Sequence, residues 1–446
     1  MELRQHQIDA VVQAQHILDK HGVAFISGEQ RTGKTIVGLA LANGAHLRSK
    51  ADGGEVLVIT RKKAMESISS DSEAFLGHAE WMTVVNYESC HKVSARDWAM
   101  VILDEVHTSG MGSYPKHGKY WKLVAEHCKN AGAVVGMSGT LFPESMAQAF
   151  GIMRVTGRGL WRDYKDFYAW WHHPGHYKRP RLCGGYGVPG AKKRVMAGQE
   201  VDDYSQVNED KVRAEVAPFC VKITRREAGF QYDKAKVVSV QLDNNNLVGV
   251  CDRIMKHGVW EGSDKEGVVR TCVYESPAAK LQGAHMACGG TLIDEDGEPF
   301  ILGEEFNPYY RAHWIHQNAK PGKKYAIQTA WIHERQLLLN YLPMATDSLE
   351  EFRQGDYRFW VASLMSFSMG VDLSWISGTQ ILYSIPFSGA HYSQVKDRQL
   401  KYDRTRPALV GVPLLNGGMD NYVFQAVNNK MDFNLAFYKS IRGGCC

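Results

Sequence analysis

Long apolar runs are missing from this chain of 446 residues, since no stretch of 18 or more consecutive apolar residues occurs in it. Such a stretch is what a membrane-spanning helix needs, so the sequence argues against an integral membrane protein. The first ten residues, MELRQHQIDA, also lack the apolar segment of a secretory signal. We therefore expect a cytoplasmic protein without a membrane partner.

Cysteine pairs with metal-binding spacing are also absent. The nine cysteines include no C-x-x-C pair, which argues against a disulfide framework or a zinc site. No low-complexity segment is found, and no repeat with a period of roughly 20 to 50 residues. The formal net charge of +4 is small, so a nucleic-acid surface would have to come from local clustering of charge. A hydrophobic fraction of 44% is that of a soluble, folded protein, and 446 residues are enough for about two or three domains.

One short stretch, GEQRTGKT at 28–35, matches the phosphate-binding pattern G-x-x-x-x-G-K-[ST] in full. The apolar run VAFIS before it predicts a buried strand, and KTIVGLALANGAHL within and after it has the apolar spacing of a helix. In that context backbone N–H groups point at phosphates, Lys34 reaches the β/γ oxygens, and Thr35 can ligate Mg²⁺. The alternative is a glycine-rich turn with no ligand. The candidate ATP-binding residues here are Gly28, Glu29, Gln30, Arg31, Thr32, Gly33, Lys34 and Thr35.

Further apolar runs follow, separated by helical stretches, at 56–60, 82–87, 99–105 and 133–140. Near-continuous apolar strands alternating with helices predict a parallel sheet covered on both faces, with ligands at the carboxyl ends of the strands. Asp104 and Glu105 fall at such an end. Behind a phosphate loop we expect Asp104 to hold Mg²⁺ and Glu105 to orient or deprotonate the attacking water. Paired acids after a strand are also common as plain loop residues.

The second half repeats this alternation without a phosphate loop, with apolar runs at 323–331, 357–363, 379–385 and 408–415. Two such sheets with one phosphate loop indicate that nucleotide binds one domain and that the other completes the site. The predicted fold class is α/β, with two RecA-like parallel-sheet lobes and a helical, basic insertion between them. The expected boundaries are 1–157 for the N-terminal ATP-binding lobe, 158–235 for the basic and aromatic insertion, 236–320 for a linker and second insertion, and 321–446 for the C-terminal lobe.

Residues 158–196 differ from their surroundings, because they hold nine Lys or Arg against two Asp, with Trp, Tyr and His between them. Cations neutralise phosphates and aromatic faces stack on bases, so this segment is the best candidate nucleic-acid surface. The alternative is a small helical insertion with an aromatic core and solvated cations. The spacing of YKDFYAWW favours the core for Trp170 and Trp171. The candidate nucleic-acid-binding residues are Arg61, Lys178, Arg179, Arg181, Lys192, Lys193 and Arg194.

Short motifs in the first half accompany the phosphate loop: LRQHQ at 3–7, DEVH at 104–107 and SGT at 138–140. In this order they resemble the motifs of superfamily 2 helicases and translocases, closest to the Snf-type double-stranded DNA motors in the compact form that bacteriophages encode. The resemblance implies that Gln7 reads the adenine edge and that the SGT motif couples hydrolysis to domain movement. The coupling residues that it implies are His107, Ser138, Gly139, Thr140 and Gln394.

The resemblance continues past the first domain and leaves only about 245–320 unexplained. FCVKITRREAG at 219–229 resembles the paired-arginine element of the family, SFSMGVDLS at 366–374 its motif V, and YSQVKDRQLKYDRTRP at 392–407 its motif VI. Motif V would place Gly370 and Asp372 at the nucleotide, and motif VI would supply Arg398 as an arginine finger.

Two departures from the family pattern bear on function. Motif V has GVDL where the chromatin-type members have a longer glycine-leucine-asparagine signature, so the remodelling class is not expected. In motif VI the second expected arginine is Lys401, which cannot reproduce the bidentate grip of a guanidinium. Arg404, one helical turn further on, is the candidate replacement.

Taken with the residues, the resemblance implies an ATP-dependent DNA helicase or translocase that uses ATP and Mg²⁺ on duplex or branched DNA, in phage replication, recombination or repair in a bacterial host cytoplasm. An RNA helicase is one alternative. A nucleotide-dependent DNA-binding switch that does not travel is another. A terminase-type packaging ATPase would need a nuclease with clustered acids in the second half, where motifs V and VI are found instead.

Overall fold

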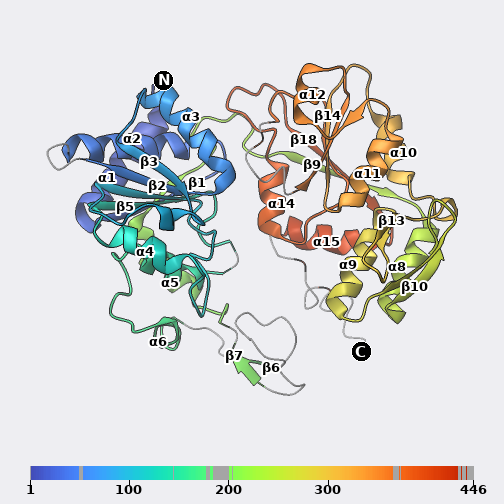
Figure 1. Ribbon diagram of the computed structural model, residues 1–446, viewed down its shortest axis with the longest axis horizontal. Coiled ribbons are helices and arrows are strands. Elements are labelled where there is room, and N and C mark those ends of the chain that lie inside the picture. The colour runs from blue at the N-terminus through green and yellow to red at the C-terminus, as the bar shows by residue number, and fades with distance from the viewer. Residues whose placement is uncertain are drawn as a thin grey trace. The chain divides into compact units, whose positions relative to one another are not determined.

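The computed structural model describes residues 2–49, 54–143, 145–176, 204–364, 371, 373–429, 433 and 438, and the backbone alone at 181–183, 200–202 and 390. The chain forms two compact units, Met1–Phe230 and Gln231–Cys446. Each unit contains a six-stranded sheet in which every strand pairing is parallel (Figure 1). The predicted α/β fold with two parallel-sheet lobes is therefore confirmed.

The sheet of the first unit has the strand order β3-β2-β4-β5-β1-β8. Its strands are β1 (Val23–Gly28), β2 (Val56–Thr60), β3 (Met82–Asn86), β4 (Met100–Asp104), β5 (Ala133–Ser138) and β8 (Cys220–Ile223). The helices are α1 (Gln5–His21), α2 (Lys34–Arg48), α3 (Met65–Leu76), α4 (Trp121–Lys129), α5 (Gln148–Val155), α6 (Phe167–Trp171) and α7 (Glu209–Val216). A separate antiparallel pair consists of β6 (Arg181–Cys183) and β7 (Glu200–Asp202).

Successive residues of the central strands enter two different cores, because side chains alternate between the two faces of a sheet. Ala24 and Ile26 of β1 pack with α1, α2 and α3, whereas Val23 and Phe25 pack with α4, α5, α6 and α7. Figure 1 shows α4 and α5 on one side of this sheet and α2 on the other. Burial on both faces explains why these strands are near-continuous apolar runs.

The expected basic insertion contributes to the first unit rather than standing apart from it. Trp161, Phe167, Trp170 and Trp171 are buried in the core that covers one face of the first sheet. The core reading of Trp170 and Trp171 is thus confirmed. At the end of the segment, β8 pairs with β1 as the edge strand of the same sheet.

The sheet of the second unit has the strand order β15-β16-β14-β17-β18-β9. Its strands are β9 (Lys236–Leu242), β14 (Tyr325–Thr329), β15 (Ala345–Thr346), β16 (Phe359–Ser363), β17 (Gln380–Leu382) and β18 (Leu409–Leu415). The helices are α8 (Asn245–His257), α9 (Pro277–Cys288), α10 (Tyr310–Asn318), α11 (Ile332–Tyr341), α12 (Leu349–Gln354), α14 (Gly389–Lys396) and α15 (Met419–Asn428). Two hairpins, β10 (Val259–Ser263) with β11 (Val269–Val273) and β12 (Thr291–Ile293) with β13 (Pro299–Ile301), complete the unit.

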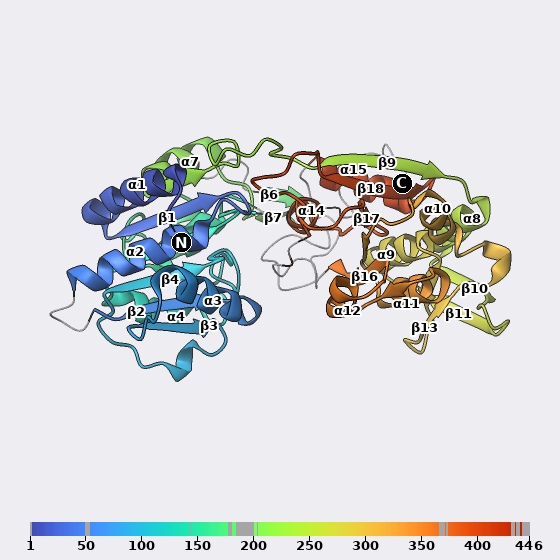
Figure 2. The same cartoon turned by 90° about the horizontal axis from the view of Figure 1, so that it is seen from above.

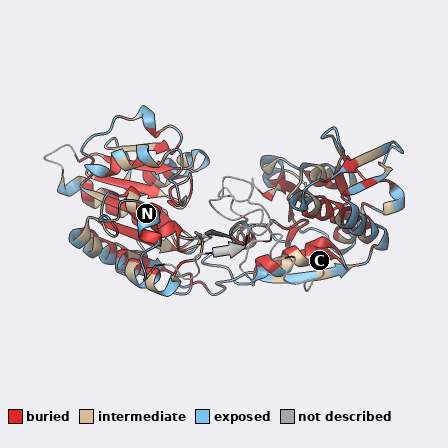
Figure 3. Cartoon of the chain, turned by 90° about the horizontal axis from the view of Figure 1, so that it is seen from below, coloured by how far each residue is buried: buried red, intermediate tan, exposed pale blue. Residues whose placement is uncertain are grey.

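Residues 236–320, expected as a linker and second insertion, belong to this second unit. β9 pairs with β18 over seven residues and forms the sheet edge (Figure 2). α8 and α9 pack on one face of the sheet together with α14 and α15, while α10 and α11 cover the other. In each unit the strands are mostly buried and the outward helix faces exposed (Figure 3). The two units meet in sequence between Phe230 and Gln231, five residues before the expected boundary at 235/236, and the other two expected boundaries, at 157/158 and 320/321, fall inside the units.

Candidate active site

The predicted phosphate loop forms the turn between β1, which ends at Gly28, and α2, which begins at Lys34. Gly33 has a left-handed backbone with a φ of 81°. This backbone angle favours glycine, and a Cβ atom at this position would also lie 2.1 Å from Nε2 of Gln7, so the Gln7 side chain would have to move. The loop therefore leads directly into the N-terminus of a 15-residue helix, which is a geometry that favours bound anions.

The first turn of α1 holds this loop from one side. A ring nitrogen of His6, Nε2, lies 3.0 Å from the carbonyl oxygen of Thr32. The Gln7 side chain accepts a hydrogen bond from the N–H of Arg4 at 2.9 Å through Oε1 and places its amide nitrogen against Gly33. Gln7 is therefore beside the phosphate loop, and its role in reading adenine stays a prediction.

The end of β8 holds the loop from a second direction. The N–H of Glu29 donates to the carbonyl of Ile223 at 2.8 Å. Arg225 returns two hydrogen bonds, from its N–H to Oε2 of Glu29 at 2.6 Å and from its Nε to the carbonyl of Gln30 at 3.1 Å. Sequence reasoning gave Arg225 no role, although the paired-arginine motif marked the position.

Asp104 is the last residue of β4, and its carboxylate is fixed by neighbouring strands. The hydroxyl of Thr60, the last residue of β2, donates to Oδ2 of Asp104 at 2.7 Å. The Tyr87 hydroxyl donates to the Asp104 backbone carbonyl at 2.9 Å. The pKa of Asp104 is raised to about 6, mainly by burial and also by the Glu105 carboxylate, while Thr60 and the Lys34 ammonium oppose the rise.

Glu105 and the coupling residues form one hydrogen-bonded group. The Ser138 hydroxyl lies 3.2 Å from Oε2 of Glu105 and 2.8 Å from Nδ1 of His107. Nδ1 of His107 is itself 3.4 Å from Oε2 of Glu105. The same hydroxyl is 2.8 Å from the carbonyl of Thr140 and accepts from the Thr140 N–H at 3.0 Å. Four predicted residues are thus joined around one buried hydroxyl.

Strand register brings this group to the phosphate loop. Ser27 of β1 pairs with Ser138 of β5, and Asp104 of β4 pairs with Met137, the residue before Ser138. A Cβ atom on Gly139 would lie 3.8 Å from the carbonyl oxygen of Gly28 and 3.9 Å from Nζ of Lys34. The structure therefore places the loop, the paired acids and the SGT motif together at the carboxyl ends of neighbouring strands, as a parallel α/β sheet requires.

Oxygen donors suitable for Mg²⁺ occur in this group. Thr35 presents a hydroxyl in the first turn of α2, and Asp104 presents a carboxylate whose orientation Thr60 fixes. Hydroxyl and carboxylate oxygens are the ligands that this hard cation prefers. The residues present therefore fit the implied ion. Among the residues that the structure describes, no group of three or more His, Cys, Asp or Glu side chains could hold a metal by itself.

The motif VI residues lie in and after α14 of the second unit. Gln394 is in the helix, and Arg398, half-buried, follows its end. The Arg404 guanidinium donates to backbone carbonyls of its own segment, Arg406 at 2.8 Å through Nε and Gln399 at 3.0 Å through Nη1. Lys401 is exposed and pairs with Asp403 at 3.3 Å. The motif V candidates Gly370 and Asp372 lie outside the described residues.

The predicted nucleic-acid residues divide between described and undescribed parts of the chain. Arg61 is half-buried directly after β2. Arg181 begins β6, where only the backbone is described. The other candidates, Lys178, Arg179, Lys192, Lys193 and Arg194, lie outside the described residues.

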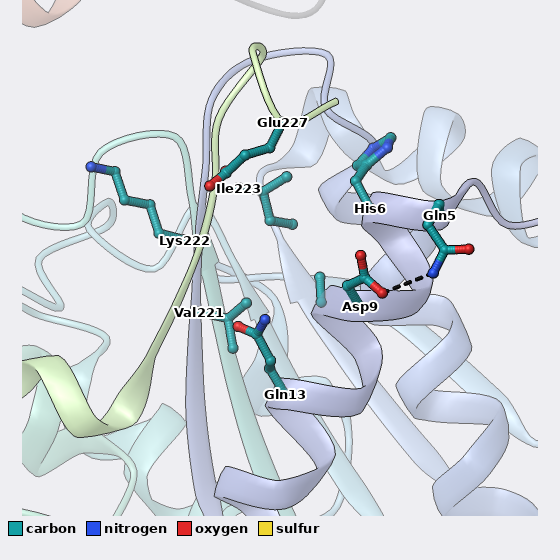
Figure 4. Close-up of a pocket in the computed structure, with 9 residues that line it drawn as sticks. Gln5, His6, Asp9, Gln13, Val221, Lys222, Ile223 and Glu227 are labelled. Atoms are coloured by element: carbon teal, nitrogen blue, oxygen red, sulfur yellow. Dashed lines mark hydrogen bonds between the residues drawn. The ribbon is translucent and has the colours of Figure 1, made fainter. Parts of the chain in front are cut away.

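A cavity of about 340 Å³ opens beside the phosphate loop, between the start of α1 and the end of β8 (Figure 4). Gln5, His6 and Asp9 project into it from α1, with Glu227 on the opposite side. Gln5 donates to Asp9 at 2.9 Å. His6 also contacts the phosphate loop, so the cavity and the loop share a residue.

No helix in the described part of the chain is long and apolar enough to cross a bilayer. No protein family model matches the chain, and no curated protein matches it either. Solved structures similar to the chain include the following two. The Sulfolobus solfataricus SWI2/SNF2 ATPase core in complex with dsDNA is 14% identical with a TM-score of 0.42, and the match covers 99% of this chain and 92% of that one. The Sulfolobus solfataricus SWI2/SNF2 ATPase core domain is 13% identical with a TM-score of 0.41, and the match covers 100% and 91%.

Proposed function

We propose that this chain is an ATP-dependent DNA translocase or helicase of superfamily 2 with a Snf-like motor. The observation that carries the proposal is the hydrogen-bonded group of Glu105, His107 and Ser138 at the edge of the phosphate loop. A site that only binds nucleotide needs no more than the phosphate loop. A motor also needs its catalytic base connected to a segment that can move, and this group provides such a connection.

In the proposed reaction the phosphates of ATP bind to loop N–H groups and to the N-terminus of α2, and Lys34 contacts the β and γ oxygens. Glu105 accepts the proton of the attacking water. His107 and Ser138 hold the Glu105 carboxylate in place. Bound Mg²⁺, held by Thr35 and Asp104, would neutralise charge on the phosphates.

Coupling would pass through the Ser138 hydroxyl. This hydroxyl carries one proton but lies within hydrogen-bond distance of two oxygen acceptors, Oε2 of Glu105 and the carbonyl of Thr140. It can therefore donate to no more than one of these two oxygens at a time. Protonation of Glu105 during hydrolysis would favour donation to Thr140, which changes the bonding of the SGT segment in step with the reaction.

The base of the nucleotide would occupy the cavity beside the loop. The volume of this cavity lies at the lower end of the range found for small-molecule sites. Asp9 and Glu227 offer acceptors for an exocyclic amine, and His6 joins the cavity to the loop carbonyl at Thr32. Gln7, one residue further along α1, would support this site through its contact with Gly33.

The second unit would complete the reaction through motifs V and VI, with Gly370 and Asp372 at the nucleotide, Arg398 as the arginine finger and Gln394 in coupling. Arg404 stays the candidate for the second finger. Its hydrogen bonds to carbonyls within its own segment also give it a part in shaping that segment.

DNA would contact Arg61 and the basic residues of 178–194. Because each neutralised phosphate releases counterions, a triple substitution of Lys192, Lys193 and Arg194 should reduce the salt dependence of duplex binding by a slope of about 0.9 per lost contact. Binding should weaken on all sequences alike. An unchanged slope would show that these cations do not touch DNA.

The deciding experiment is ATP turnover measured without nucleic acid and with single-stranded, duplex and branched DNA and single-stranded RNA. Duplex or branched DNA should stimulate turnover most, and Lys34→Ala should remove the activity in every condition. Stimulation mainly by RNA would favour the RNA helicase. Equal rates with and without DNA would favour the nucleotide-dependent switch.

A further inference from the structure

The phosphate loop is bonded to the segment through which the chain leaves the first unit. Arg225 lies two residues after β8 and hydrogen-bonds Glu29 and Gln30 of the loop, 196 and 195 residues earlier in the sequence. Five residues after Arg225 the first unit ends at Phe230. The loop and the exit of the chain are thus joined through one residue.

The segment at 224–230, called the exit segment below, is a turn closed by its own hydrogen bonds. Oε2 of Glu227 accepts hydrogen bonds from the N–H and the hydroxyl of Thr224, both at 2.8 Å. The N–H groups of Ala228 and Phe230 donate to the carbonyls of Thr224 and Arg225, each at 3.0 Å. Ala228 and Phe230 are buried. A movement of this turn therefore moves Arg225.

Arg225 is placed to control the direction of a loop N–H group. Its Nε donates to the carbonyl of Gln30, and that carbonyl shares a rigid peptide plane with the N–H of Arg31. The N–H of Arg31 points away from that carbonyl across the same plane, so fixing the direction of the carbonyl also fixes the direction of the N–H. Arg31 has a left-handed backbone with a φ of 68°, which a residue with a side chain adopts only when its surroundings hold it. Arg225 is only 5% exposed, so water competes little for this bond.

We infer that Arg225 is a positioning residue that sets the phosphate loop in its nucleotide-binding form and couples nucleotide binding to the exit segment at 224–230. The inference rests on the proposed function, because it assumes that the loop binds ATP. The inference adds a route by which nucleotide binding and the order of the turn at 224–230 affect each other. Bound nucleotide stabilises the turn, and a disturbed turn weakens nucleotide binding, as linkage requires.

The first test compares Arg225→Ala, Arg225→Lys and a matched control, Arg226→Ala, whose side chain is exposed. Loss of a charge-assisted hydrogen bond should raise the Kd of a fluorescent ATP analogue and the KM for ATP about tenfold in Arg225→Ala. kcat should stay within about threefold, because Glu105 and Ser138 are untouched. Arg225→Lys should recover part of the affinity, and Arg226→Ala should match the wild type.

A second variant covers the case in which Arg225→Ala fails to fold. Glu29→Ala removes the acceptor from the loop side, and its side chain is exposed, so the core is unchanged. It should raise the Kd of the ATP analogue in the same direction. Folding of each variant is checked by circular dichroism and thermal melting.

The coupling is tested by hydrogen exchange of the wild-type chain with and without the ATP analogue. Nucleotide should slow exchange of the amides of Ala228, Gly229 and Phe230 at least severalfold, and this protection should be lost in Arg225→Ala at saturating nucleotide. Equal exchange with and without nucleotide, or an Arg225→Ala affinity equal to that of Arg226→Ala, would overturn the inference. Failure of the proposed function differs from both, since it would show as wild-type ATP turnover that DNA does not stimulate, or stimulates less than RNA does, while the ATP analogue still binds.

Discussion

Trp170→Ala tests whether the aromatic residues of the segment before β6 are a core or a stacking surface. Trp170 is fully buried, and its ring centroid lies 5.1 Å from that of Trp161, 4.9 Å from His176, 5.3 Å from Phe150 and 5.5 Å from Phe167. Phe150, Trp161, Phe167 and Trp170 belong to the core that covers one face of the first sheet. Truncation to Ala removes an indole from their centre.

The expected cost is about 3 to 5 kcal/mol, the usual range for Trp or Phe truncated to Ala in a core. For a unit of this size each kcal/mol lowers Tm by about 2 to 4 °C, so the first unit should melt about 6 to 20 °C lower. Trp170→Phe keeps an aromatic ring and should cost less. Tyr168→Ala is the matched control on the same helix, because Tyr168 is 36% exposed.

The assay is thermal unfolding of the full chain followed by circular dichroism, paired with duplex DNA binding well below the transition. Trp170→Ala should melt earlier and bind DNA as the wild type does. A variant that melted normally but bound DNA less tightly would refute the core assignment and would indicate that Trp170 stacks on bases.

The remaining predictions concern catalysis and pH. Lys34→Ala should abolish turnover, and Glu105→Gln should bind ATP normally but turn over at least about 100-fold more slowly, because an amide cannot accept the water's proton; near-normal rates in either would contradict the site. Arg398→Ala should lower kcat far more than nucleotide affinity, as stopped-flow and steady-state measurements would show, since a finger acts on charge that develops in the transition state. Arg404→Ala should lower Tm, because its guanidinium donates to backbone carbonyls; a normal Tm with lost kcat would make it the second finger. Burial raises the pKa of Glu334 from 4.5 to about 7, so its contribution to stability is complete below pH 4.5 and is lost as pH rises through 7. Urea unfolding should therefore show wild type losing about 3 kcal/mol from this group between pH 4.5 and 8, and Glu334→Gln should not show that loss.

The central strands could be predicted from sequence because burial on both faces makes them near-continuous apolar runs, as in 56–60 and 133–138. The edge strands β8 and β9 could not. β9 alternates half-buried and exposed residues along most of its length, and β8 has four residues, one of them an exposed lysine. Because these two strands were not recognised in the sequence, residues 158–235 were expected to be an insertion and residues 236–320 a linker and second insertion.

For the site, the sequence predicted the residues that a motif fixes but not their distant partners. Lys34, Asp104, Glu105 and Ser138 are all in recognisable motifs, and register brings their strands to one edge of the sheet. Thr60 and Arg225 act through contacts 44 and 195 or more residues away, which depend on strand order rather than on local pattern. Arg398 and Arg404 illustrate the limit within one motif, because spacing alone did not show that the Arg404 guanidinium donates to the backbone carbonyls of Arg406 and Gln399.

The order of synthesis gives the position of β8 a further consequence. β1 and the phosphate loop leave the ribosome early, but the strand that closes the sheet beside them, and Arg225 after it, are made about 195 residues later. Until then the nascent loop lacks its hydrogen bonds from Arg225, and the pairing that supplies them has a high loop-closure cost. A nascent chain, or a fragment cut at residue 157, would carry the complete phosphate-binding motif and still bind nucleotide poorly. Under the proposed function, the ability to bind ATP would thereby be deferred until the whole first unit has been translated.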